Sequence, residues 1–170
     1  MQKKSEVALR AIEPNDLEFL YQAENDQALW HVGVVHQPLS KHTLKAYLEN
    51  AHQTIEEAGQ LRLAIETGTD GLVGMIDVFD YDATNQRAGV GIMVLEQFQQ
   101  KGYATAAVQL LKEYCKTQLL LHQLHCQIQS TNAKSISLFE KCGFNTTGTL
   151  HQWQRTINGF EDVHVLQCIL

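Results

Sequence analysis

The chain of 170 residues carries 44% hydrophobic and 19% charged side chains, with a formal net charge of −6. This length and balance predict one globular domain, residues 1–170, with a sizeable core and no linker segment. The negative charge argues against a nucleic-acid partner, because such a partner requires a basic face. It mildly favours a cationic substrate, although acidic proteins also use such charge simply for solubility.

The start of the chain and its cysteines predict a cytoplasmic protein with no membrane partner. The first residues lack the long apolar stretch of a signal peptide, and no uninterrupted apolar run approaches the ~20 residues that span a bilayer. The cysteines form no CxxC pair, which is typical of reduced thiols in the cytosol. They are Cys115, Cys126, Cys142 and Cys168.

The first half of the chain predicts a strand, two helices and then three strands. A strand over 7–12 is followed by Pro14, which suits the first turn of a helix reaching Glu24. Ser40 is a suitable N-cap for a second helix, whose apolar stripe continues to Ile55 and which Gly59 ends. Short turns then separate the apolar runs, so we expect an antiparallel meander. Its strands are 61–65, 72–81 and 87–95.

The second half alternates differently. A polar loop over 96–102 leads into a helix with an apolar face from Ala104 to Cys115, and a strand follows over 124–128. Asn132 is a good N-cap for a helix to Cys142. Two closing strands, 144–150 and 160–169, complete the order. Because helices and strands do not alternate throughout, a regular doubly wound sheet is excluded.

The strongest motif is the hexad Gln-Gln-Lys-Gly-Tyr-Ala over 99–104, which lies between a strand and a helix. A helix N-terminus attracts phosphate through its unpaired N–H groups and its dipole. Gly102 permits close approach of the backbone, Lys101 adds positive charge, and Thr105 offers a hydroxyl. The alternative is structural, since a glycine before a helix is common.

Four segments together resemble the GNAT acetyltransferase superfamily. The hexad matches the acyl-CoA signature (Gln/Arg)-x-x-Gly-x-(Gly/Ala), and the run over 87–94 looks like the strand that precedes it. The segment 130–144, with Asn-x-x-Ser-Ile and Lys-x-Gly-Phe pieces, resembles the second CoA element. The opening 9–17 is similar to the branch that contains ribosomal-protein and spermidine N-acetyltransferases.

This resemblance implies an α/β (α+β) GNAT fold: a mostly antiparallel sheet of about seven strands and about four helices, splayed between strands four and five. It implies acetyl-CoA as cosubstrate in the splay and a possible homodimer. Backbone groups of Ile92, Met93 and Val94 would hold the pantetheine arm, and Asn132 and Ser135 would contact the cofactor from the other side. The loop residues that would take the pyrophosphate are Gln99, Gln100, Lys101, Gly102, Tyr103, Ala104 and Thr105.

The implied reaction is attack of a primary amine, from a small polyamine or a peptide N-terminus, on the thioester. The family's usual general acid is a tyrosine, and the matching position holds Phe139, which can contact the cofactor but cannot donate a proton. Three interpretations stay open. The thiolate leaves unaided, as a thiol pKa of about 8.5 permits; Cys142 or Tyr103 substitutes; or the protein is a non-catalytic acetyl-CoA sensor.

Candidates for the general base lie in the strand over 72–81. Asp77 and Asp80 interrupt an apolar run, and a regular strand places them on opposite faces, so one of them would face the cleft. Asp80 could equally begin the following turn and face water. Glu24 and Asp26 are weaker candidates for an amine pocket.

Histidines and one tryptophan are secondary candidates. His122 and His125 have HxxH spacing but no third ligand nearby, so no metal site is expected. His31 and His36 lie in the loop that borders the acceptor site in the GNAT family, where a titrating imidazole would help proton transfer. Trp153 would line the cleft or pack across strands.

Overall fold

A computed structural model describes residues 7–26 and 37–170 of the chain. Its helices are η1 (Pro14–Asp16), α1 (Leu17–Glu24), α2 (Lys41–Glu49), α3 (Ile55–Ala58), η2 (Glu96–Phe98), α4 (Tyr103–Thr117) and α5 (Ala133–Lys141). Its strands are β1 (Val7–Ala11), β2 (Leu61–Thr67), β3 (Gly71–Asp82), β4 (Arg87–Val94), β5 (Gln123–Gln129), β6 (Asn145–Thr156) and β7 (Gly159–Ile169).

Within these residues the strands form one seven-stranded sheet in the order β1-β2-β3-β4-β5-β7-β6. All neighbours are antiparallel except β4 and β5, which pair in parallel at only three positions, Arg87 to Gly89. The sheet is therefore joined at the start of these two strands and splays beyond it. The expected fold class, with its splay between strands four and five, is confirmed.

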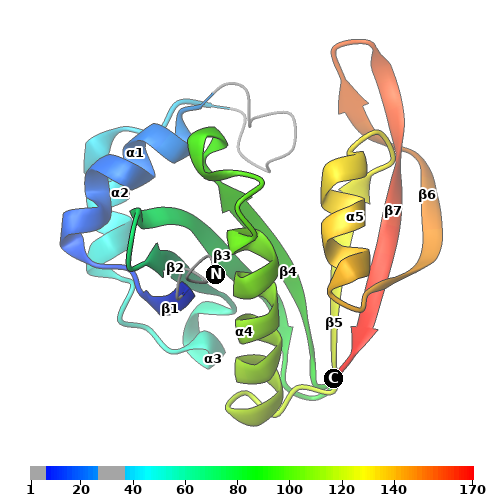
Figure 1. Cartoon of the computed structure of the whole chain (residues 1–170), viewed down its shortest axis with the longest axis horizontal. Helices are drawn as coiled ribbons and strands as arrows, with labels where there is room; N and C mark the ends of the chain where they lie inside the picture. The colour runs from blue at the N-terminus through cyan, green and yellow to red at the C-terminus, as the bar shows by residue number, and fades with distance from the viewer. Residues whose placement is uncertain (1–6, 27–36) are drawn as a thin grey trace, which may run out of the picture.

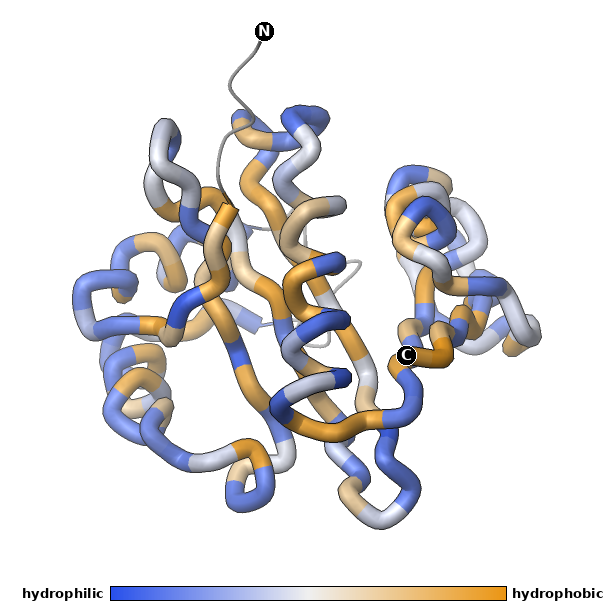
Figure 2. Tube along the Cα trace, turned by 60° about the horizontal axis from the view of Figure 1, so that its bottom comes forward, coloured by the Kyte–Doolittle hydropathy of each residue, from blue (hydrophilic) through white to orange (hydrophobic). Residues whose placement is uncertain are grey.

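The two faces of the sheet carry different helices (Figure 1). The larger apolar cluster joins Val108 and Leu111 of α4 and Phe139 of α5 to strand residues such as Ile76 and Leu124. A smaller cluster packs α1 and α2 against the opposite face of β2 and β3. Figure 2 shows α4 with β1 to β4 on one side and α5 with the last strands on the other. No helix of the described residues is long and apolar enough to cross a bilayer.

The prediction of a single helix between Ser40 and Gly59 is wrong, because the chain forms two helices there, α2 and α3. Ser40 does cap α2, accepting a hydrogen bond from the Thr43 N–H, but α2 ends at Glu49. Thr54 and Glu57 then make a reciprocal capping box that begins α3, and Gly59 ends it at φ 68°. The apolar stripe continued across the break, while the capping signal marked a new start.

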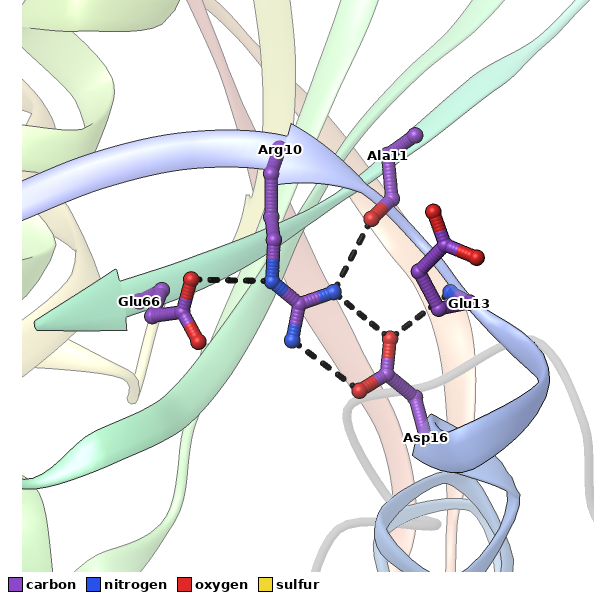
Figure 3. Close-up of polar contacts among 5 residues, drawn as sticks. All are labelled: Arg10, Ala11, Glu13, Asp16 and Glu66. Atoms are coloured by element: carbon purple, nitrogen blue, oxygen red, sulfur yellow. Dashed lines mark hydrogen bonds and ion pairs between the residues drawn. The ribbon is translucent and has the colours of Figure 1, made fainter.

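An ion pair between the half-buried Arg10 and the buried Asp16 anchors the first turn to the sheet (Figure 3). Arg10 of β1 donates to both oxygens of Asp16, at 2.8 and 3.0 Å, and to Glu66 of β2 at 3.0 Å. Asp16 is only 6% exposed and also accepts from the Glu13 N–H. Hydrogen bonds from the Arg10 guanidinium hold the pKa of Asp16 below its ordinary value.

We expect Asp16→Asn to lower the free energy of unfolding by about 2 kcal/mol near neutral pH, because Arg10 loses its buried partner. The pKa of this carboxyl is depressed in the folded state, so its stabilisation is present above the unfolded pKa of about 3.9 and is lost as the pH falls through the folded value. Denaturant titrations should therefore show that the difference in unfolding free energy between wild type and Asp16→Asn becomes smaller below about pH 4. Glu18→Gln, which breaks an exposed pair with Lys41, is the control and should cost under about 0.5 kcal/mol. A gap that stays constant at acid pH would contradict this assignment.

Candidate active site

The opening in the sheet leaves the far half of β4 without a partner on one side. β4 pairs with β3 along its length, from Gly89 to Val94. Its pairing with β5 stops at Gly89. Main-chain groups of β4 beyond that point are therefore available to an extended ligand that enters the splay.

The alternation of β4 decides which of these groups face the opening. The Leu95 N–H donates to Val73 O at 3.1 Å. In an antiparallel ladder every second residue bonds to the same neighbouring strand, so Met93, two residues earlier, also turns its main-chain groups toward β3. Ile92 and Val94 turn theirs away from β3, and the Val94 carbonyl accepts a bond from the Gln99 side chain at 3.0 Å. Of the three residues expected to hold a pantetheine arm, Ile92 and Val94 thus present their backbones to the opening.

The start of α4 has the geometry of an anion site. Gly102 is the N-cap at φ 85°, and its helix has no side-chain capping bond. The preceding Gln100 is also left-handed, at φ 61°. The first N–H groups of any α-helix lack intrahelical partners. In α4 they lie beside the end of β4, where the sheet opens.

Lys101 and Tyr103 are held by a shared carboxylate. Asp70, in the β2–β3 turn, accepts from Lys101 Nζ at 2.9 Å and from the Tyr103 hydroxyl at 2.7 Å. These two hydrogen bonds lower the pKa of Asp70. Tyr103 is 5% exposed and belongs to the core, so the structure gives it a packing role that also fixes the loop. Asp70 was not singled out in the sequence.

Across the opening, Asn132 caps α5, as expected. Its side-chain oxygen accepts a bond from the Ser135 N–H at 3.1 Å. Both residues are half-buried at the N-terminal end of the helix. The structure therefore brings Asn132 and Ser135 together, on the β5 side of the opening.

Asp77 is engaged in an ion-pair cluster. Arg62, its neighbour on β2, donates to both of its oxygens, at 2.6 and 3.0 Å, and also to Glu24 of α1. The Tyr47 ring lies 5.8 Å from the guanidinium carbon. Burial alone would lower the pKa of Arg62, but the two carboxylates outweigh it and raise the pKa. Asp77 thus already holds a cation of its own chain.

Asp80 lies in a bulge that the sequence did not predict. The β3–β4 register shifts between Phe79 and Asp82, and Asp80 adopts φ 49°. Its side chain lines a pocket with His125 of β5 and Gln167 of β7. These residues share the face of the sheet that carries α1, α2 and Asp77. The expectation that Asp77 and Asp80 occupy opposite faces is therefore wrong, since it assumed a regular strand.

Comparisons with known proteins agree with this geometry. Residues 6–145 match the family model described as "Acetyltransferase (GNAT) domain". The chain belongs to the GNAT acetyltransferase family. Spermidine N(1)-acetyltransferase of Vibrio cholerae is 27% identical over 94% of this chain and 90% of its own. The Escherichia coli K12 enzyme of the same name is 27% identical over 96% and 85%. The crystal structure of the Vibrio cholerae spermidine N-acetyltransferase with CoA and spermine superposes with a TM-score of 0.85 at 23% identity, covering 96% of this chain and 95% of that one.

This GNAT protein is therefore an acyltransferase that uses acetyl-CoA and acetylates an amine. The comparisons give no support to a non-catalytic sensor. At the position of the usual tyrosine, Phe139 is 3% exposed and packs edge-on against Phe144, with ring centroids 5.0 Å apart. Cys142 is 1% exposed, and burial raises the pKa of its thiol.

We expect Cys142→Ala to leave kcat unchanged and to lower the free energy of unfolding by about 1 kcal/mol, because the thiol fills core space. A general acid would instead give a fall of about a hundredfold or more in kcat. Steady-state kinetics and denaturant titration separate these outcomes. Cys126→Ala is the matched control, since that thiol is equally buried, at 2% exposure, on β5.

Other sequence candidates divide into those the structure places and those it does not. Trp153 is 61% exposed on β6. Among the residues that the structure describes, no three His, Cys, Asp or Glu side chains are grouped to hold a metal. His31 and His36 lie outside the described residues. Sequence reasoning missed Arg62. The sequence offered only one indication of its role, a lone cation in a strand that precedes the acidic strand β3.

Proposed function

We propose that this GNAT enzyme acetylates a small polyamine. The observation that carries the proposal is the acidic face beneath α1 and α2. Glu24 of α1 and three carboxylates of β3, Asp77, Asp80 and Asp82, lie on this side of the sheet. Arg62 pairs with Glu24 and Asp77, and Arg87 pairs with Asp82. A face with more carboxylates than cations suits an acceptor with several ammonium groups. The relatives named spermidine N(1)-acetyltransferases support the same class.

The cofactor would be held from both sides of the opening. Acetyl-CoA supplies an acetyl group activated as a thioester. We assign its pantetheine arm to the backbones of Ile92 and Val94, which β5 leaves without a strand partner. We assign its pyrophosphate to the loop from Gln99 to Thr105, at the uncapped start of α4. Asn132, Ser135 and Phe139 would flank it from α5.

The chain's own groups would then assist the transfer by position and polarity. The Ile92 N–H faces the opening and would donate to the acetyl carbonyl oxygen as negative charge develops there. The amine would approach from the α1 and α2 face, since α4 and α5 cover the other. With Phe139 in place of tyrosine, the thiolate would leave without an acid from this helix. Of the two candidate bases, Asp77 has both oxygens bonded to Arg62, and Asp80 lies near the level of Gly89, about 10 Å along β4 from Ile92.

Release of free thiol from acetyl-CoA tests the proposal directly. The acceptors to compare are spermidine, spermine, N-terminal peptides, lysine peptides and aminoglycosides. We expect turnover with the polyamines to exceed turnover with the peptides by at least about tenfold in kcat/KM. Peptide N-termini as the preferred acceptors would overturn the polyamine assignment while leaving the family chemistry intact.

We also propose a cytoplasmic location and self-association. The four cysteines are all free and buried, as suits a reducing compartment. Trp153, Ile157 and Phe160 are 61%, 100% and 63% exposed around the β6–β7 hairpin, and such apolar side chains favour a protein contact. One solved spermidine N-acetyltransferase from Vibrio cholerae, 25% identical, is described as dodecameric. Light scattering tests this surface: if the hairpin joins subunits, Trp153→Ser should have a lower molar mass in solution than wild type.

A further inference from the structure

A polar pocket lies at the closed end of the splay, where β4 and β5 still pair. Its volume is about 460 Å³, and it opens on the face of the sheet away from α4 and α5. Five strands contribute to it, from β3 to β7. The side chains that matter to its chemistry are Asp80, Asp82, Arg87, Gln123, His125 and Gln167.

Most polar groups of this pocket already have partners. Arg87 lies 3.2 Å from Asp82, which also accepts from the Asn85 side chain at 2.7 Å. Gln167 donates to Gln123. These contacts satisfy the rim of the pocket within the chain.

Two side chains of the pocket remain without such partners. Among the described residues, the side chains of Asp80 and His125 have no hydrogen bond or ion pair, and the charges of Asp80 and Arg87 act on the pKa of His125 in opposite directions. Asp80 is exposed, and its side chain lines the pocket. The two carboxylates of the pocket outnumber its one guanidinium, so the pocket as a whole favours a cation.

His125 is suited to receive a cationic ligand. Burial lowers its pKa, and Arg87 lowers it further, while Asp80 acts in the opposite direction with a smaller effect than burial. The net result is a pKa below the ordinary value, so the ring is neutral at pH 7 and does not repel an ammonium group. A neutral imidazole also presents one ring nitrogen as a hydrogen-bond acceptor.

The distance from this pocket to the reacting end of the opening can be read along β4. His125 pairs with Gly89, and Ile92 lies three residues further. At about 3.3 Å per residue, the two levels are about 10 Å apart along the strand. One amine of a long acceptor can thus lie near the Ile92 N–H while another reaches Asp80.

We propose that this pocket is a subsite for the distal ammonium group of a diamine or polyamine acceptor, with Asp80 as counter-ion and His125 as hydrogen-bond acceptor. The inference rests on the proposed acetylation of an amine beside Ile92. It predicts that the preferred acceptor has two nitrogens separated by about the distance between Ile92 and Asp80. A monoamine of the same carbon chain lacks the second charge and gains nothing from the pocket.

The experiment compares kcat/KM for terminal diamines, from diaminopropane to diaminodecane, with monoamines of equal chain length. Wild type should prefer the diamine increasingly until its nitrogens span about 10 Å, and by about tenfold at that length. Asp80→Asn should bring the ratio of diamine to monoamine close to one. Glu113→Gln removes an exposed carboxylate of α4 and is the matched control, which should keep the wild-type ratio.

A ratio unchanged in Asp80→Asn would overturn the subsite. An equal loss for diamines and monoamines would also overturn it, because it would make Asp80 part of the proton transfer. Calorimetric titration of diaminoheptane, whose extended chain matches that span, into the CoA-loaded protein gives a readout independent of turnover. If no amine is acetylated, the proposed function fails. A Kd for the diamine that is tenfold higher in Asp80→Asn than in wild type would still support the subsite, whereas equal Kd values would reject it.

Discussion

Gly102→Val should raise the Kd for acetyl-CoA at least about a hundredfold, a loss of about 2.7 kcal/mol of binding free energy. Gly102 holds φ 85° at the N-cap of α4, a conformation that a β-branched residue adopts only under strain. Either the backbone turns away and the N–H groups no longer converge, or the side chain enters the space over them. Both outcomes deny a phosphate its close approach to the helix.

Stability should respond differently from binding. A Cβ at Gly102 meets nothing within 4 Å, so the cost in the free protein is confined to the backbone, about 1–2 kcal/mol. Gly59→Val is the matched control, because Gly59 is also left-handed, at φ 68°, with equally open surroundings at the end of α3. The two variants should melt alike, and only Gly102→Val should lose acetyl-CoA in calorimetry. Wild-type affinity in Gly102→Val would remove the loop from the site.

The proposed cofactor half of the site was accessible to sequence reasoning because it depends on local signals. A glycine before a helix, an asparagine cap and a strand that ends at the loop are each read from neighbouring residues. Gly102 and Asn132 accordingly hold the positions expected of them. The lack of a β5 partner beyond Gly89 is a long-range property, and the resemblance to the GNAT family supplied it.

The proposed acceptor half depends on strand register, which local signals do not determine. Extending the turn pair Thr67 and Gly71 without interruption would place Arg62 opposite Ile76. A bulge between Ile65 and Glu66 shifts the register by one residue, so Arg62 meets Asp77 instead. Asp80 shows the same effect on the other edge of β3. In each ladder one inserted residue sets the register. As a result Asp77 is paired with Arg62, whereas Asp80 has no ion-pair partner among the described residues.

That difference in pairing can be tested on Arg62. Arg62→Met should lower the free energy of unfolding by about 3 kcal/mol, because Glu24 and Asp77 would stay close together, partly buried and without their shared cation. Denaturant titration should show most of this loss restored in the triple variant that adds Glu24→Gln and Asp77→Asn, since the charges to be compensated are then gone.

The same variants decide whether Asp77 takes part in proton transfer. If it serves the ion-pair cluster, Asp77→Asn lowers stability but keeps kcat within about threefold of wild type, measured well below its melting temperature. A general base would instead give a fall of about a hundredfold or more in kcat, with no recovery in the triple variant. The bidentate bond to Arg62, at 2.6 and 3.0 Å, argues for the first result, because each carboxylate oxygen already accepts an N–H donor and the carboxylate is already paired with a cation.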